Sequence, residues 1–126
     1  MFDVLHDNHV LGYEVDVRAA RITFRTESDY AGGPKEHDAV FEGVLAYFFQ
    51  DGLGGILLSI DERPFDEVLR RYAEMFERGS RDGWPWISEL EPAAHVARNE
   101  GRAFLITGSI GFDGFVIAKS ARVESS

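Results

Sequence analysis

Two neighbouring segments near the N-terminus alternate apolar with polar residues, and this period of two constrains the fold more than any other feature. Successive side chains of a strand point to opposite faces, so each segment is expected to be a strand with one buried face. The short connection between them predicts an antiparallel β-hairpin. The alternating positions are Leu11, Tyr13, Val15 and Val17 in the first segment and Ile22, Phe24 and Thr26 in the second.

The remaining segments predict further strands separated by loops. Residues 28–38 contain two glycines, a proline and several charges, which favours a loop. Residues 39–50 fit either a strand or a helix, and their aromatic and β-branched residues favour a strand. Residues 52–55 predict a glycine-rich connector and residues 55–60 a short strand. Residues 102–109 and 115–123 predict a closing hairpin.

One long amphipathic helix is expected at about 64–78. Pro64 suits its first turn, Asp66 and Glu67 complement the positive end of the helix dipole, and Gly79 ends it. A second short helix fits residues 92–99. The sequence therefore predicts a single α+β domain over residues 1–126, in which a mainly antiparallel sheet of hairpins packs against the long helix. The apolar stripe of that helix comprises Phe65, Val68, Leu69, Tyr72, Ala73 and Phe76.

The composition excludes several kinds of chemistry. The 126 residues include no cysteine, so disulfides, thiolate metal sites and cysteine nucleophiles are impossible. The N-terminal residues lack the basic and apolar regions of a signal peptide, and no stretch reaches the length of a membrane span. A cytoplasmic location is expected, and no cofactor is implied.

The negative charge is concentrated in one part of the chain. Residues 1–77 hold 16 acidic and 7 basic residues, a net charge of −9, whereas residues 78–126 hold 6 of each. Such a charge disfavours nucleic acid and anionic membranes as partners, because both repel it. It fits a basic protein partner, although solubility alone is the simpler and favoured interpretation.

Two histidine–aspartate groups are candidate metal ligands. His6, Asp7 and His9 lie close together in sequence, and His37 precedes Asp38. Imidazole and carboxylate together can hold a divalent metal or polarise a water molecule. His6 and His9 face the same way only on a helix or tight turn, and the simpler interpretation is a polar turn before the first strand.

Trp84 and Trp86 flank a proline in a predicted loop and are the candidate binding residues, together with His6 and Asp7. Tryptophan is enriched at binding hot spots, although it also fills protein cores. An acidic set and several hydroxyl groups are weaker candidates for acid–base or nucleophilic roles, with capping and structural roles as the alternatives. These residues are Asp61, Glu62, Asp66 and Glu67 in the acidic set, and Ser59, Thr107 and Ser109 with His95.

Short motifs give the chain a resemblance to a family of small uncharacterised bacterial proteins. The motifs are Leu5-His6-Asp7, the Phe41-Glu42-Gly43-Val44 strand and the ILLSIDE segment before the predicted helix. Some similar domains are described as immunity proteins of toxin systems. The resemblance implies an α+β fold and no assigned activity.

Three hypotheses about function follow. The first is a non-enzymatic binding domain, of immunity or regulatory type, that recognises a basic protein. The second is a small metal-dependent hydrolase that uses His6, Asp7 and His9. The third is a homodimeric structural module whose sheet edge or tryptophan loop serves for assembly.

Overall fold

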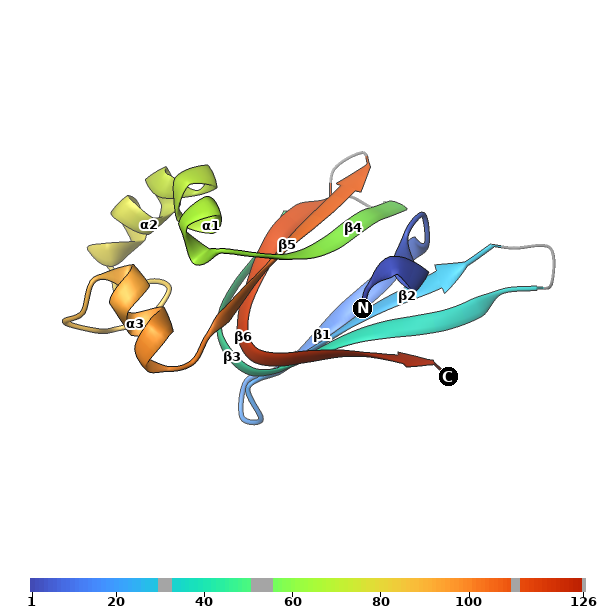
Figure 1. The fold of residues 1–126 in the computed structure, drawn as a ribbon, viewed down its shortest axis with the longest axis horizontal. Helices are drawn as coiled ribbons and strands as arrows, with labels where there is room; N and C mark the ends of the chain where they lie inside the picture. Colours follow the sequence, from blue (N-terminus) through green and yellow to red (C-terminus); the bar gives the residue numbers. More distant parts are fainter. Residues whose placement is uncertain (30–32, 51–55, 110–111, 126) are drawn as a thin grey trace.

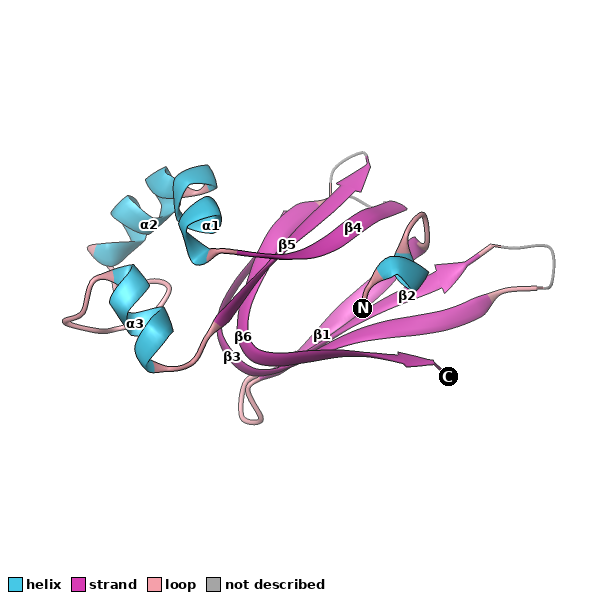
Figure 2. Cartoon of the chain, viewed as in Figure 1, coloured by secondary structure: helices cyan, strands magenta, loops and turns pink. Residues whose placement is uncertain are grey.

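A computed structural model describes residues 1–29, 33–50, 56–109 and 112–125 (Figure 1). The described strands form a closed barrel in the order β1-β2-β3-β6-β5-β4, and every neighbouring pair is antiparallel. Three short helices gather at one end of the barrel (Figure 2). The elements are η1 (Asp3–Leu5), β1 (His9–Asp16), β2 (Arg21–Ser28), β3 (Lys35–Gln50), β4 (Ile56–Arg63), α1 (Phe65–Arg71), α2 (Ala73–Ser80), α3 (Pro92–Arg98), β5 (Arg102–Ser109) and β6 (Asp113–Ser125).

The two longest strands, β3 and β6, bend sharply and belong to both layers of the barrel (Figure 1). The lower layer contains β1, β2 and residues 35–42 of β3, and the upper layer contains β4, β5 and residues 44–50 of β3. Gly43 lies between the two parts of β3 with φ +64°, a backbone conformation that residues other than glycine rarely adopt. A register shift between Val44 and Ala46 follows directly. Glycine and a bulge are the usual devices by which a strand turns a corner.

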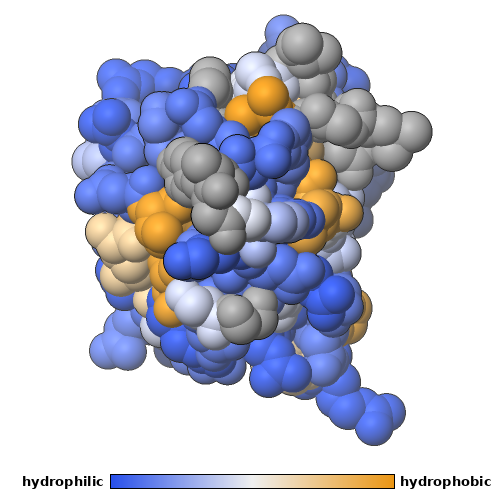
Figure 3. All heavy atoms as spheres, turned by 90° about the vertical axis from the view of Figure 1, so that its right-hand side faces the viewer, coloured by the Kyte–Doolittle hydropathy of each residue, from blue (hydrophilic) through white to orange (hydrophobic). Residues whose placement is uncertain are grey.

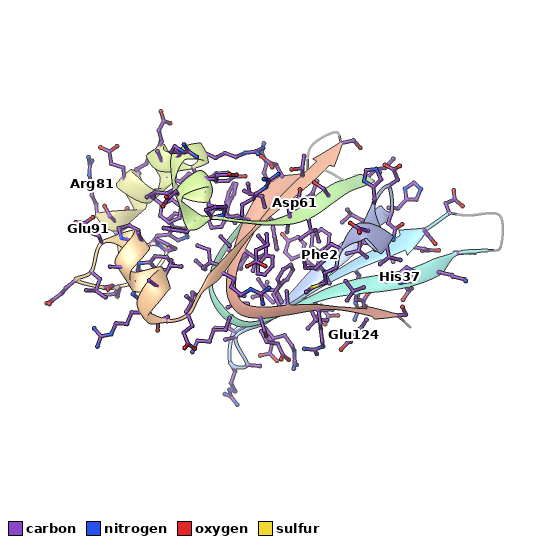
Figure 4. All side chains as sticks on the ribbon, viewed as in Figure 1. Phe2, His37, Asp61, Arg81, Glu91 and Glu124 are labelled. Carbon is purple, nitrogen blue, oxygen red and sulfur yellow. The ribbon has the colours of Figure 1, made fainter. Side chains whose placement is uncertain are left out.

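The barrel closes where β1 meets β4, through the pairing of His9 with Ile56. The N-terminal turn η1 covers this seam and contacts β2 and β4. Phe2 points inward there, with its ring 6.2 Å from Phe41 and 5.9 Å from Phe104 (Figure 4). The N-terminal turn therefore supplies apolar contacts at the place where strand pairing is sparse.

The inward faces of the strands form an aromatic core. Phe24, Phe41 and Phe104 are completely buried, and Phe24 lies 5.2 Å from the ring of Phe112. The alternation along β2 predicted this burial, because Ile22, Phe24 and Thr26 are the positions that face inward. Such contacts hold the barrel together without any disulfide.

The predicted long helix at 64–78 is wrong. Its residues form two short helices, α1 and α2, which meet at Tyr72 with φ −115° and ψ 29°. Tyr72 is fixed by contacts with the sheet: its ring lies 5.0 Å from Phe115, and its hydroxyl donates a hydrogen bond to Asp113. These tertiary contacts coincide with the break, and no proline or glycine in the apolar stripe signals it.

The helices and the following loop form a second apolar cluster on the upper layer. Val68, Phe76 and Val96 are buried there against Phe115 and Ile117 of β6. The α+β description, a sheet packed on one long helix, is therefore replaced by an antiparallel barrel capped by three short helices. The third of these helices, α3, lies where the sequence predicted a short helix at 92–99.

Other boundaries also differ from the sequence prediction. The predicted loop at 28–38 is too long, because Ser28 ends β2 and β3 begins at Lys35, pairing with it. Residues 39–50 form a strand throughout. The glycine-rich connector at 52–55 and the centre of the closing hairpin, residues 110–111, lie outside the described residues.

A candidate binding groove between the barrel and the helical layer

A groove with a volume of about 510 Å³ lies between the β1–β2 hairpin, β3 and the loop after α2. This volume falls within the range of about 300–1,000 Å³ that is typical of ligand sites. Most of the lining residues have apolar side chains. The lining residues are Val15, Asp16, Val17, Ala20, Arg21, Ile22, Val44, Leu45, Ala46, Tyr47, Phe48, Phe49, Trp84 and Pro85.

The groove exists because β2 is shorter than β3. The pairing of β2 with β3 ends at Arg21 and Glu42, and one further hydrogen bond joins the Val44 N–H to the Ala20 carbonyl at 2.9 Å. Beyond that point β3 continues with β6 alone among the described strands. The hairpin end and the later part of β3 therefore diverge, and the space between them is the groove.

The loop after α2 supplies another wall. The Trp84 N–H donates a hydrogen bond to the Gly79 carbonyl at 2.8 Å, which returns the chain toward the end of α2. A Cβ atom at Gly79 would lie only 2.5 Å from the Trp84 ring, so the close approach of this ring requires glycine. The same ring packs 5.4 Å from Phe76, and Trp84 is thus both part of the core and part of the groove.

Charged residues form a network on the outer face of the lower layer, next to the groove. Arg21 lies 3.7 Å from Asp16 and 3.9 Å from Glu42, and Arg122 lies 3.1 Å from Glu42. Asp16 and Arg21 also line the groove. The border of the groove thus contains one carboxylate and one arginine, and the network continues from Arg21 to Glu42 and Arg122.

Asp38 lies on the same outer face, with one carboxylate oxygen buried and without a hydrogen-bond partner among the described residues. Burial raises the pKa of this carboxyl group above its ordinary value. Arg25 opposes the increase in pKa, whereas Glu36, Glu124 and Glu14 add to it. The lower layer therefore carries a carboxylate whose ionisation is disfavoured by its surroundings.

The predicted histidine–aspartate residues lie at the other end of the barrel, and each has a different neighbour. His6 and Asp7 follow η1, with 3.6 Å between Nε2 and Oδ2. His9 lies 4.0 Å from Asp29. His37 is within hydrogen-bond distance of Ser125, 3.1 Å from Nδ1 to Oγ, near the C-terminal end (Figure 4). Among residues 1–29, 33–50, 56–109 and 112–125, no three histidine or acidic side chains are grouped so as to hold a metal ion.

A smaller hollow of about 250 Å³ brings His6 close to residues of β4. Its lining includes Asp3, Ser59 and Asp61 as well as the buried Phe2. The structure therefore associates His6 with Asp61, a pair that sequence spacing did not suggest. The end of the molecule opposite the helices is mostly hydrophilic on its described surface, with separate small apolar patches (Figure 3).

The remaining candidates are distributed over several elements. Glu62 accepts two hydrogen bonds from Arg102, which lower its pKa, and Glu67 lies 3.9 Å from Arg63. His95 stacks on Trp86 in the helical layer, whereas Ser59 pairs with Thr107 across β4 and β5. The acidic set and the hydroxyl groups thus do not form one shared site.

Comparisons with known proteins give little guidance. No protein-family model matches the chain, and no solved structure matches it. The chain is similar to spore germination protein XA of Bacillus anthracis, with 31% identity over 85 residues. That match covers 68% of this chain but only 16% of the relative. Within the described part of the chain, no helix is long and apolar enough to cross a membrane.

Among the predicted binding residues Trp84 lines the groove, whereas the residues of the opposite wall were not predicted as a site. The sequence pattern only placed Tyr47 and Phe49 on one face of a strand. The available signal was Gly43, which interrupts an otherwise apolar run and marks the corner after which β3 leaves β2. The pairing partners of a strand cannot be read from its own pattern, so the groove could not be placed.

Proposed function

We propose that this chain is a non-enzymatic binding domain whose groove receives an apolar side chain of a basic protein partner. The observation that carries the proposal is the groove itself, which places Tyr47, Phe49 and Trp84 around one concave space. A large apolar pocket with a few polar groups at its border is the usual form of a binding site. Aromatic walls of this kind accept a buried anchor residue, which supplies much of the binding energy at protein interfaces.

The exposed part of the wall supports this proposal. Tyr47 is 38% exposed although it lies in an apolar strand, and Val17 at the hairpin end is 85% exposed. Neither residue contributes its whole surface to the core, so each has apolar area available to a partner. Covering this area would add favourable free energy in proportion to the surface removed from water.

The charge supports a basic partner. The net charge is −9, and all of it resides in residues 1–77, which include the hairpin and β3. Complementary charges mainly raise the rate of association and make that rate sensitive to salt. An apolar anchor in the groove would instead slow dissociation. An immunity or regulatory role in the cytoplasm is consistent with such recognition and stays part of the proposal.

The test is photo-crosslinking from the groove. A benzophenone amino acid at Tyr47 is expected to crosslink one basic protein in cells, and the same group at Leu11 is the control. Leu11 is 48% exposed on β1 and is not part of the groove lining. For the captured partner, purified and titrated, Tyr47→Ser should weaken binding by about tenfold or more, as loss of an interface aromatic does.

Two results would oppose the proposal. Equal crosslinking from Tyr47 and Leu11, or binding that Tyr47→Ser leaves unchanged, would exclude the groove as the site. An association rate that does not change with salt would mean that the charge serves solubility alone. Light scattering separates the homodimer hypothesis, because a dimer that dissociates in Tyr47→Ser would assign the groove to self-assembly instead.

A further inference from the structure

Residues 45–50 of β3 have one backbone side that no described strand uses. The side facing β6 is paired along the whole strand, from His37 with Ser125 to Gln50 with Asp113. The other side is paired with β2 only as far as Glu42, followed by the single hydrogen bond of Val44 to Ala20. The later part of β3 is therefore an edge strand toward the groove.

The groove borders this edge and not a face of the strand. Phe49 belongs to the barrel core, whereas Ala46 and Phe48 pack against the helical layer on the opposite face. Residues of both groups nevertheless line the same groove. Side chains that alternate between two faces can line one groove only if the strand edge lies between them, so the backbone N–H and C=O groups of this edge face the groove.

This edge has no charged side chain and no proline, two of the features that usually prevent strand pairing, and its bulge lies at its start, between Val44 and Ala46. Edge strands are normally protected by charged side chains, proline or a bulge at the exposed edge. The segment Val44–Gln50 has the sequence VLAYFFQ, with neither charge nor proline. Strand β1 provides a contrast, because it carries the acids Glu14 and Asp16.

We infer that the partner contributes an extended segment that pairs with the edge of β3 as an additional strand. This inference rests on the proposed function and specifies how the partner occupies the groove. An added strand continues both faces of the sheet, so its side chains would alternate. One set would lie on the barrel side beside the apolar Phe49, and the other would lie on the opposite face beside Trp84, where Asp16 also lines the groove.

Apolar and basic residues should therefore alternate in the bound segment. A second copy of this chain is a poorer occupant, because its own β3 edge borders the same groove, whose lining also includes the β1–β2 hairpin and Pro85. Pairing of two such edges would bring the groove walls of both copies together. The net charge of −9 on each copy also opposes their association.

The test uses a short capped synthetic peptide that alternates lysine with valine and phenylalanine. Two further peptides have the same side chains but carry backbone N-methyl groups on only the odd or only the even residues. In an added strand, alternate N–H groups point to the neighbouring strand, so methylation of one set should weaken binding by about tenfold or more. Methylation of the other set should have little effect.

Hydrogen exchange of the protein gives an independent result. The unmethylated peptide should slow exchange at alternate amides within residues 45–50. Tyr47→Lys, which places a positive charge on the edge, should abolish binding, whereas Leu11→Lys on β1 should preserve it.

Equal effects of the two methylated peptides, or binding without added protection of β3, would overturn strand addition and leave the groove proposal standing. A peptide that does not bind would likewise overturn strand addition and leave the groove proposal standing. Peptide binding that Tyr47→Lys leaves intact would overturn strand addition at this edge, and the crosslinking experiment would then decide the proposed function separately.

Discussion

The imidazole ring of His95 stacks on the indole ring of Trp86, with 4.4 Å between ring centroids and 26° between ring planes. The contact joins α3 to the loop after α2, and Trp86 also lies 6.4 Å from Phe76. Trp86 does not line the groove, whereas Trp84 does. The two tryptophans are therefore expected to act differently, with Trp86 holding the helical layer together and Trp84 facing the partner.

A double-mutant cycle tests the first of these roles. Trp86→Ala and His95→Ala should couple by about 0.5–1.5 kcal/mol in the free energy of unfolding, as measured in denaturant melts, because a stacked pair contributes roughly this amount. Trp86→Ala should leave the affinity for a groove-bound partner nearly unchanged after correction for the folded fraction. Additive single changes would show that the stack has no energetic role.

Phe76→Ala should destabilise the protein by about 3–5 kcal/mol, because it leaves a cavity among four aromatic rings. Leu69→Ala is the matched comparison. Leu69 is half-buried at the edge of the same cluster, so its cost should lie near the lower end of the range of about 2–5 kcal/mol for such changes. Urea unfolding measures both, and equal costs would contradict the difference in burial.

Asp38→Asn should increase stability at neutral pH. Burial raises the pKa of Asp38 in the folded protein above its value in the unfolded chain. The contribution of this carboxyl group to stability is therefore complete below the unfolded pKa, and it is lost as pH rises through the folded pKa. The asparagine variant removes this dependence, so its melting temperature relative to the wild type should rise between pH 3 and pH 7. A variant less stable than the wild type at pH 7 would mean that the attraction of Arg25 outweighs the cost of burial.

Tyr72 should ionise well above the ordinary pKa of a tyrosine. Burial, with Asp113 nearby, raises its pKa to about 12, so the group contributes stability below pH 10 that is lost as pH rises through the folded value. Tyr72→Phe should therefore remove a step near pH 12 from an absorbance titration of the folded protein. It also leaves Asp113 bound to Arg71 alone and should cost about 0.5–1.5 kcal/mol at pH 7. Loss of a step at an ordinary tyrosine pKa instead would contradict the effect of burial on Tyr72.

Sequence patterns were sufficient where the information was local. The alternation in Ile22, Phe24 and Thr26 specified a strand and its buried face, because side chains of a strand alternate with a fixed period. The stripe around Leu69 and Phe76 indicated helical structure in this region, but it predicted one long helix where the structure has two short ones. It could not show the interruption at Tyr72, where contacts with Phe115 and Asp113 coincide with a change of backbone conformation.

Only the tertiary structure decided how the strands are arranged. The sequence contains Gly43 and a long apolar strand, but the bend that lets β3 serve two layers depends on its pairing with both β2 and β6. The groove exists because the pairing of β3 with β2 stops at Glu42 and Arg21, whereas β3 itself continues. Strand pairing joins residues far apart in the chain, so the alternation within each strand fixes its own faces but not its neighbours.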